Sequence, residues 1–416
     1  MATIRPFRAL RPPRDRVARV VAPPYDVVDT AEARALARGN ADSFLRVSRP
    51  EIDLADDVDP HADAVHDAGR DALADLVARG VLVPDPEPGM LVYRQRTDLP
   101  GPGGEPRTVT QTGVVGCATV ADYADGVIAT HEHTRPDKET DRTRHIAALG
   151  AHDEPVFLMY RADAPGAREV GAVVAAVVAR APEYDLVTDD GVAHTLWTVA
   201  PAEAAALEEA FAAMPALYVS DGHHRSAAAA RVAGERSTPG AGEFPVVVFP
   251  ADELTILPYN RVVADLGGAD PQAFLASLAA DFDVELADGA PAPGRHQLGL
   301  HLAGRWYLAT AHPDVVDDAD PIARLDVSVL QDRVLGPLLG ITDPRTDQRI
   351  AFVGGIRGTD ELERLVRSGR AAAAFLLHPT SPEEVMDVAD GGQVMPPKST
   401  WFEPKLRSGF FVHPFD

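Results

Sequence analysis

Cysteine is almost absent from this chain of 416 residues, since Cys117 is its only one. A disulfide within the chain needs two cysteines and a cysteine metal cluster needs several, so both are excluded. No apolar run approaches the roughly 20 residues that span a bilayer. Residues 1–19 also lack the apolar core of a signal peptide. We therefore expect a cytoplasmic protein with no membrane partner.

Positive charge is also scarce, because the chain has 39 lysines and arginines but 63 acidic residues, and its formal net charge is −24. Binding to duplex nucleic acid requires a basic face, so nucleic acid is not expected as a main partner. The content of 45% hydrophobic and 25% charged residues is that of a globular protein. The length exceeds one ordinary core and predicts two or three domains.

Lysine and asparagine are the rarest polar residues, with three lysines and two asparagines in the whole chain. Such a skew toward arginine is typical of coding bias. A lysine that is present despite this bias can mark a position that needs a compact ammonium group, which arginine does not mimic. We interpret the segments around Lys138, Lys398, Lys405, Asn40 and Asn260 as walls of a site rather than as solvated surface.

The most informative segment runs from Leu217 to Ser226 and reads Leu-Tyr-Val-Ser-Asp-Gly-His-His-Arg-Ser, followed by four alanines. An apolar run, a glycine and a strong helix former predict a strand, a turn and a helix. The first N–H groups of a helix have no partner inside it and attract anions. Gly222 permits close approach of a ligand, and Arg225 adds a bidentate donor. The alternative is an ordinary helix capped by Ser220 or Asp221, with exposed histidines.

The periodicity of apolar residues predicts a mixed α/β (α+β) fold. Helices are expected at 30–38, 137–149, 164–181 and 201–213, and strands at 20–28, 154–160, 193–199, 244–249 and 372–377. A hairpin is expected from strands at 90–96 and 108–120. Proline and glycine near 161–167 and 286–295 suggest three regions: 1–163, 164–290 with the anion turn, and 291–416 with the loop from Met395 to Lys405.

Smaller groups of residues carry weaker signals. His131, Glu132 and His133 can place two imidazoles on one face of an extended segment, but no third zinc ligand is apparent. Carboxylates in turns, such as Asp26 and Asp326, are candidates for a general base or a Mg²⁺ ligand. The glycine-rich segment 354–358 lacks the spacing of nucleotide-binding loops and predicts a simple turn.

Six motifs occur in order along the chain and together resemble one family. They are Pro23-Pro24-Tyr25-Asp26, Ser43-Phe44-Leu45-Arg46, His131-Glu132-His133-Thr134, Asp221-Gly222-His223-His224-Arg225, Pro258-Tyr259-Asn260-Arg261 and Met395-Pro396-Pro397-Lys398-Ser399-Thr400. The chain is similar to the bacterial and archaeal family known as domain of unknown function 1015. That resemblance covers nearly the whole chain but implies no activity by its name.

The Asp-Gly-His-His-Arg motif also resembles the phosphate loop of free-serine kinases in the ParB/sulfiredoxin superfamily. This resemblance covers about five residues with the flanking strand and helix, and it implies a ParB/sulfiredoxin-like phosphate-binding module with additional mixed-sheet domains. Sulfiredoxin chemistry is not expected, because His223 stands where its reactive cysteine would be. The net charge of −24 argues against DNA clamping of the ParB kind.

These observations predict a phosphotransferase that moves a phosphoryl group from ADP, ATP or pyrophosphate to a small-molecule hydroxyl, and L-serine is the preferred acceptor. Two alternatives use the same anion site and stay open: a non-catalytic sensor that binds a nucleotide or a phosphometabolite, and a phosphatase. Mg²⁺ is the expected cofactor, with Asp221 as its ligand. The sequence does not determine the oligomeric state.

The predicted roles divide the candidate residues into sets. The catalytic residues are Glu132 as the base, Asp221, His223 and Lys398. The phosphate-binding residues are Gly222, His223, His224, Arg225, Ser399 and Thr400. The residues expected to bind the acceptor are Asp26, Asn40, Ser43, Arg46, Asn260 and Arg261, where Arg46 suits a substrate carboxylate.

Overall fold

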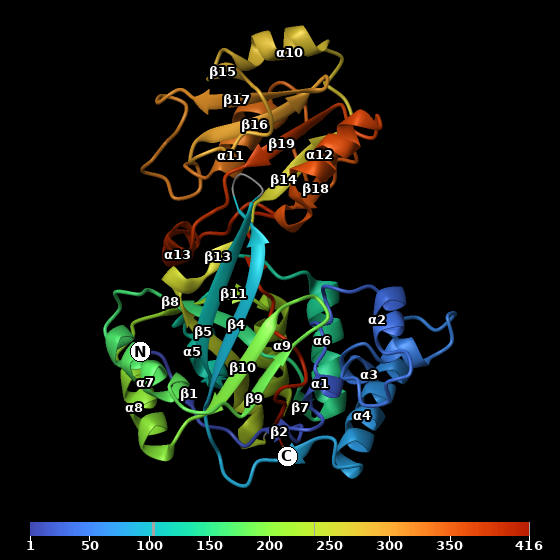
Figure 1. Ribbon diagram of the computed structural model, residues 1–416, viewed down its shortest axis with the longest axis vertical. Helices are drawn as coiled ribbons and strands as arrows, with labels where there is room; N and C mark the ends of the chain where they lie inside the picture. Colours follow the sequence, from blue (N-terminus) through green and yellow to red (C-terminus); the bar gives the residue numbers. More distant parts are fainter. Residues whose placement is uncertain (102–104, 237, 416) are drawn as a thin grey trace. The chain divides into compact units, whose positions relative to one another are not determined.

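The computed structural model describes residues 1–101, 105–236 and 238–415, and the chain forms two compact units (Figure 1). The first unit comprises Met1–Thr97, Thr110–Leu254 and Pro404–Asp416, and the second comprises Asp98–Val109 and Thr255–Glu403. Neither unit is continuous in sequence, because strands from distant segments pair with one another. The boundaries of the regions 1–163, 164–290 and 291–416 therefore differ from those of the units.

One mixed sheet organises the first unit, with strands in the order β6-β11-β8-β12-β5-β4-β10-β9 and β1 paired to β5. β8 runs antiparallel to β11 and parallel to β12. The strands are β1 (Ile4–Arg5), β4 (Leu91–Pro100), β5 (Pro106–Thr119), β6 (Ile128–Ala129), β8 (Val156–Tyr160), β9 (Tyr184–Val187), β10 (Ala193–Thr198), β11 (Leu217–Asp221) and β12 (Glu243–Pro250). Short ladders join β2 (Leu10–Arg11) to β3 (Val83–Pro84) and β7 (Ala151–His152) to β21 (His413–Pro414).

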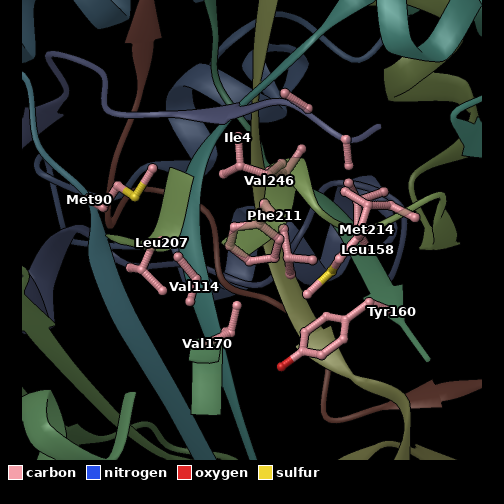
Figure 2. Close-up of a cluster of buried hydrophobic side chains, with 14 of the residues drawn as sticks. Ile4, Met90, Val114, Leu158, Tyr160, Val170, Leu207, Phe211, Met214 and Val246 are labelled. Atoms are coloured by element: carbon pink, nitrogen blue, oxygen red, sulfur yellow. The ribbon is translucent and has the colours of Figure 1, made fainter. Parts of the chain in front are cut away.

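Helices cover this sheet, and every residue of β8 is buried as a result. The helices are α1 (Val17–Val20), α2 (Thr30–Leu36), α3 (Leu45–Ser48), α4 (Asp63–Ala78), α5 (Val120–Ala124), α6 (Pro136–Leu149), α7 (Ala167–Val178), α8 (Pro201–Ala212) and α9 (His223–Glu235). Figure 2 shows Leu207 and Phe211 of α8 in the main core with Leu158 of β8 and Val246 of β12. No helix in the described ranges combines the length and the apolar character that a membrane crossing requires.

The second unit contains a separate sheet in the order β15-β17-β16-β19-β14-β18. Its strands are β14 (Tyr259–Val263), β15 (Phe282–Ala287), β16 (Gln297–Leu302), β17 (Arg305–Ala311), β18 (Ile350–Gly354) and β19 (Ala373–Leu377), and β13 (Thr255–Ile256) pairs with β20 (Phe402–Glu403). Its helices are α10 (Pro271–Leu278), α11 (Asp326–Leu330), α12 (Gly358–Arg367) and α13 (Pro382–Asp390). A π-helical turn at Gln331–Leu335 follows α11 directly.

The structure confirms the mixed α/β class and most of the expected elements. The helices expected at 137–149, 164–181 and 201–213 are α6, α7 and α8, and the hairpin expected from 90–96 and 108–120 is β4 and β5. Asp29 caps α2 through a capping box with Glu32. The prediction of a strand at 20–28 was wrong, because this segment contains the end of α1, turns and a single bridge at Ala22. Pro23 and Pro24 explain the difference, because proline has no N–H to donate to a ladder.

The different burial of two helical leucines predicts that their replacement by alanine changes stability to different extents. Leu207 is fully buried in the main core, whereas Leu36 of α2 is 53% exposed. Leu207→Ala should lower the free energy of unfolding by about 2–5 kcal/mol, because it removes buried methyl groups and leaves a cavity. Leu36→Ala should stay within about 0.5 kcal/mol of the wild type. Urea denaturation measures both, and equal losses in the two variants would contradict this packing.

Candidate functional site

The turn at residues 221–225, called here the Asp221–Arg225 turn, joins β11 directly to α9. Gly222 is the N-cap of α9 and has a φ of 98°, a conformation that side chains with a Cβ rarely adopt. A Cβ at this position would also lie 3.3 Å from the Cζ atom of Arg225. His223, His224 and Arg225 form the first turn of the helix, and their amides are among those with no partner inside it. The expected strand, glycine and helix are therefore all present.

Arg225 is buried and surrounded by carboxylates from three segments of the first unit. Its guanidinium lies 3.6 Å from Asp26, 3.9 Å from Glu154 and 3.8 Å from Asp221, and it donates to the carbonyl of Pro155. Burial disfavours the charged guanidinium, but the negative charges of Asp26, Asp221 and Glu154 raise the pKa of Arg225. The charge of Arg225 is thus balanced within the protein.

Asp221 uses both of its carboxylate oxygens in local contacts. Oδ1 accepts from the amide of Gly222 at 2.9 Å, and Oδ2 lies 3.1 Å from the Nζ of Lys405. Burial opposes ionisation, yet the charges of Lys405 and Arg225 hold the pKa of Asp221 well below its usual range. Asp221 is therefore a carboxylate at neutral pH, and a metal ion bound to it would have to compete with Lys405.

Glu154 is a buried carboxyl group of the site that no sequence pattern indicated. Its Oε1 accepts from the amide of Tyr25 at 2.9 Å and from the hydroxyl of Ser408 at 2.7 Å. Its buried Oε2 has no hydrogen bond in the described part of the chain. Burial raises the pKa of Glu154 to about 7, although the charge of Arg225 opposes the shift. This group therefore changes its charge close to physiological pH.

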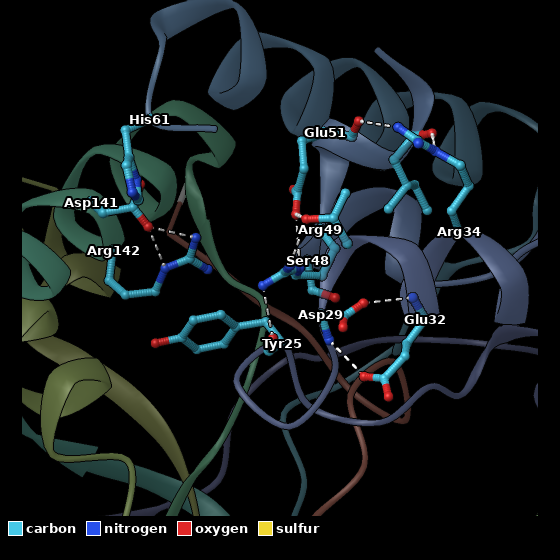
Figure 3. A network of polar contacts seen from close by, with 12 residues as sticks. Tyr25, Asp29, Glu32, Arg34, Ser48, Arg49, Glu51, His61, Asp141 and Arg142 are labelled. Carbon is cyan, nitrogen blue, oxygen red and sulfur yellow. Dashed lines mark hydrogen bonds and ion pairs between the residues drawn. The ribbon is translucent and has the colours of Figure 1, made fainter. Parts of the chain in front are cut away.

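The loop that carries Asp26 is held in place through Tyr25, as Figure 3 shows. The guanidinium of Arg142 lies 4.1 Å from the centre of the Tyr25 ring and pairs with Asp141 at 3.0 Å. Arg49 donates to the carbonyl of Tyr25 at 3.2 Å. These contacts fix the backbone next to Asp26, and they explain how a proline-rich segment without strand structure positions an acidic side chain.

Two buried histidines meet beside the turn. The rings of His131 and His223 lie 4.5 Å apart and nearly perpendicular, and the amide of His131 points to the Nε2 of His223 at 3.5 Å. Neither ring nitrogen of His131 has a hydrogen bond within the described residues. The donor atoms of His131, Glu132 and His223 all lie within 4.8 Å of one another. His223 thus supplies the third candidate ligand that the sequence did not reveal.

The other predicted residues of the first unit lie in local structures of their own. Asn40 donates to the carbonyl of Arg19 at 2.7 Å, and Arg46 donates to the carbonyl of Asn40 at 3.1 Å and pairs with Asp53. Ser43 is buried next to them. Among the described residues, no hydrogen bond joins this group to the Asp221–Arg225 turn. Their role in acceptor binding stays a prediction.

The remaining predicted residues belong to the second unit: Asn260, Arg261, Lys398, Ser399 and Thr400. Arg261 donates to the carbonyl of Lys398 at 3.1 Å. Asn260 accepts from an amide of β19 at 3.1 Å, and the Ser399 hydroxyl donates to a carbonyl three residues earlier at 2.6 Å. These residues form one connected group, and their catalytic and binding roles stay predictions.

The raised pKa of Glu154 predicts a specific dependence of stability on pH. Between its ordinary pKa near 4.5 and its folded pKa of about 7, Glu154 binds more proton in the folded chain than in the unfolded chain. Its contribution to stability is therefore complete below pH 4.5 and is lost as the pH rises through 7. As the pH rises from 5 to 8, the free energy of unfolding of Glu154→Gln should increase by about 1–3 kcal/mol relative to that of the wild type.

Denaturant titrations of wild type and Glu154→Gln at pH 5 and pH 8 measure this difference. The contributions of most other titrating groups are the same in both proteins and cancel when the two unfolding free energies are subtracted. Glu209→Gln, on the exposed surface of α8, is the matched control for the exchange of a glutamate for glutamine. A difference between Glu154→Gln and wild type that stays constant from pH 5 to pH 8 would show that Glu154 titrates normally.

Comparisons with known proteins give a family but no activity. No curated protein matches the chain. Similar solved structures include a conserved hypothetical protein from Pyrococcus furiosus, at 12% identity and a TM-score of 0.34 over 69% of this chain and 90% of that chain. A free serine kinase in complex with AMP gives 11% identity and a TM-score of 0.36 over 69% and 86%.

SbnI with a C-terminal truncation, from Staphylococcus aureus, gives 11% identity and a TM-score of 0.39 over 70% of this chain and 84% of that chain. Similarity at this level supports no functional argument. The family comparison is more direct, because the model described as "Protein of unknown function (DUF1015)" matches residues 4–328. The chain therefore belongs to the DUF1015 family.

Proposed function

We propose that this protein is a small-molecule phosphotransferase and that the transferred phosphoryl group binds at the Asp221–Arg225 turn. The observation that carries the proposal is the start of α9, where Gly222 in a left-handed conformation precedes buried His223 and Arg225. Helix amides and the helix dipole favour an anion at this position. His223 and His224 can add side-chain donors. The donor substrate is ADP, ATP or pyrophosphate.

The charge of the surrounding residues bears on how a phosphate would bind. Asp26, Glu154 and Asp221 already balance Arg225, and Asp221 also pairs with Lys405. A phosphate at the helix start therefore meets no uncompensated guanidinium, and further positive charge would strengthen its binding. A divalent cation supplies such charge in many phosphoryl transfers.

The group formed by His131, Glu132 and His223 fits a divalent cation. The ring nitrogens of His131 are buried without hydrogen bonds in the described part of the chain, and the donor atoms of the three residues lie within 4.8 Å of one another. Two imidazoles and one carboxylate suit transition metals such as Mn²⁺ better than Mg²⁺, which prefers oxygen ligands. When bound, the cation would neutralise phosphate charge. The expected role of Asp221 as a Mg²⁺ ligand is less favoured, because both of its oxygens are engaged.

The proposed reaction forms one bond and breaks one bond at phosphorus. The hydroxyl oxygen of the acceptor attacks the terminal phosphorus of the donor, and the bond from that phosphorus to the leaving phosphate or nucleotide oxygen breaks with its electron pair. The hydroxyl proton passes to the carboxylate oxygen of Glu132 that does not hold the cation, so Glu132 is the proposed base as well as a proposed ligand. Phosphoryl transfer depends mainly on positioning and charge stabilisation, and a carboxylate can accept the hydroxyl proton. L-serine is the proposed acceptor because the turn resembles that of free-serine kinases.

A direct assay tests this proposal. The purified protein is incubated with L-serine, with ADP, ATP or pyrophosphate, and with Mg²⁺ or Mn²⁺, and O-phosphoserine is measured by mass spectrometry. We expect O-phosphoserine with at least one donor. Binding of a donor without any turnover would instead indicate a sensor, and release of free phosphate without phosphoserine would indicate a phosphatase. Either result would overturn the proposal.

Glu132→Gln tests the proposed base. This variant keeps the shape of the side chain but cannot accept the proton, so kcat should fall at least tenfold, equivalent to about 1.4 kcal/mol or more in the barrier. Glu209→Gln is the control and should keep full activity. The Kd for Mn²⁺, measured separately, distinguishes a base from a metal ligand, because loss of a ligand weakens Mn²⁺ binding. Full activity in Glu132→Gln would remove Glu132 from the mechanism.

A further inference from the structure

One buried arginine has no acidic partner among the residues that the structure describes. Four arginines are buried among the described residues: Arg142, Arg225, Arg261 and Arg407. Three of them lie within 4.0 Å of a carboxylate. In the described part of the chain no such ion pair includes Arg261, which lies on β14 of the second unit. Since an unpaired buried charge is strongly disfavoured, its presence calls for a physical reason.

The contacts of Arg261 orient its guanidinium without cancelling its charge. It donates to the carbonyls of Tyr259 and, at 3.1 Å, of Lys398. It also lies 5.3 Å from the centre of the Phe352 ring. Two of its five N–H donors are used in this way, and three remain. Burial lowers the pKa of Arg261 to about 9, so the group still carries its charge at neutral pH.

Arg261 lines a cavity of about 290 Å³ that lies within the second unit. The other walls are largely apolar and include Val327, Leu335, Phe352, Pro396 and Pro397. Leu335 comes from the π-helical turn at Gln331–Leu335, and π-helical turns are frequent at functional sites.

A second arginine at the cavity is already paired. Arg345 lies 2.9 Å from Asp343, and both residues line the cavity. Their charges cancel, and Arg345 is largely exposed to solvent. Arg261 is therefore the cation that the described cavity walls leave without compensation.

We propose that this cavity binds a small organic anion with an oxyanion head, a carboxylate or a phosphate, on an apolar body. The head accepts from the free N–H groups of Arg261, and the body packs against Val327, Leu335 and Phe352. Such a ligand supplies the negative charge that the described residues around Arg261 do not, and charge-assisted bonds to a planar guanidinium favour an oxyanion over other anions. The proposed anion site belongs to the second unit, and it does not depend on the proposed phosphotransfer.

Calorimetric titration of the full chain with three ring compounds of similar size tests the proposal. Benzoate carries a carboxylate, phenyl phosphate carries a phosphate, and benzyl alcohol is uncharged. We expect at least one of the two anions to bind at least ten times more tightly than benzyl alcohol, and the better of the two identifies the head group. Absence of binding by both anions, or equal binding of the alcohol, would overturn the proposal.

A variant that blocks the cavity locates the binding. Removing Arg261 would also free the carbonyls of Tyr259 and Lys398, so the blocking residue is placed at Thr342, an exposed residue of the cavity wall. Thr342→Trp should weaken binding of the anion at least tenfold. Thr346→Trp, at an exposed position of the same loop that does not line the cavity, should bind it like the wild type. Unchanged binding in Thr342→Trp would show that the anion binds elsewhere.

Discussion

The site in the first unit depends on one buried guanidinium. Arg225 lies close to three carboxylates: Asp26 in the N-terminal loop, Glu154 in the segment before β8 and Asp221 at the end of β11. Burying a charge is tolerated only when opposite charges and hydrogen bonds compensate it. Removal of Arg225 would leave the carboxylates of Asp26, Glu154 and Asp221 without the cation that they share. The residue therefore holds the site together as well as bordering it.

This arrangement constrains the chemistry that the site can perform. Because Arg225 and Lys405 are already paired with carboxylates, the anion-binding capacity of the turn comes mainly from the first amides of α9. The histidines beside the turn are buried, and the ring nitrogens of His131 lack hydrogen bonds in the described ranges. A phosphate at the helix start and a cation on the neighbouring imidazoles would compensate each other. The Arg261 cavity shows the converse situation, in which a buried cation lacks any acidic partner among the described residues.

Local sequence patterns predicted the elements, and tertiary pairing decided the contents of the site. The strand, glycine and helix around Gly222 follow from an apolar run, a turn residue and an alanine-rich segment, so the sequence was sufficient there. The meeting of His131 with His223 follows from the pairing of β6 with β11, which no local pattern encodes. Glu154 lies at the start of an apolar strand, where nothing in the sequence marks it as buried. The lack of a partner for Arg261 could not be predicted either, since ion pairs depend on distant segments.

The proposed chemistry depends on an oxyanion at the start of α9. Crystals of the protein soaked in tungstate, an anomalous scatterer similar to phosphate, test whether one binds there. We expect an anomalous peak within hydrogen-bonding distance of the amides of His223, His224 and Arg225. A well-ordered crystal with tungstate bound elsewhere and no peak at this turn would show that the turn is not an oxyanion site.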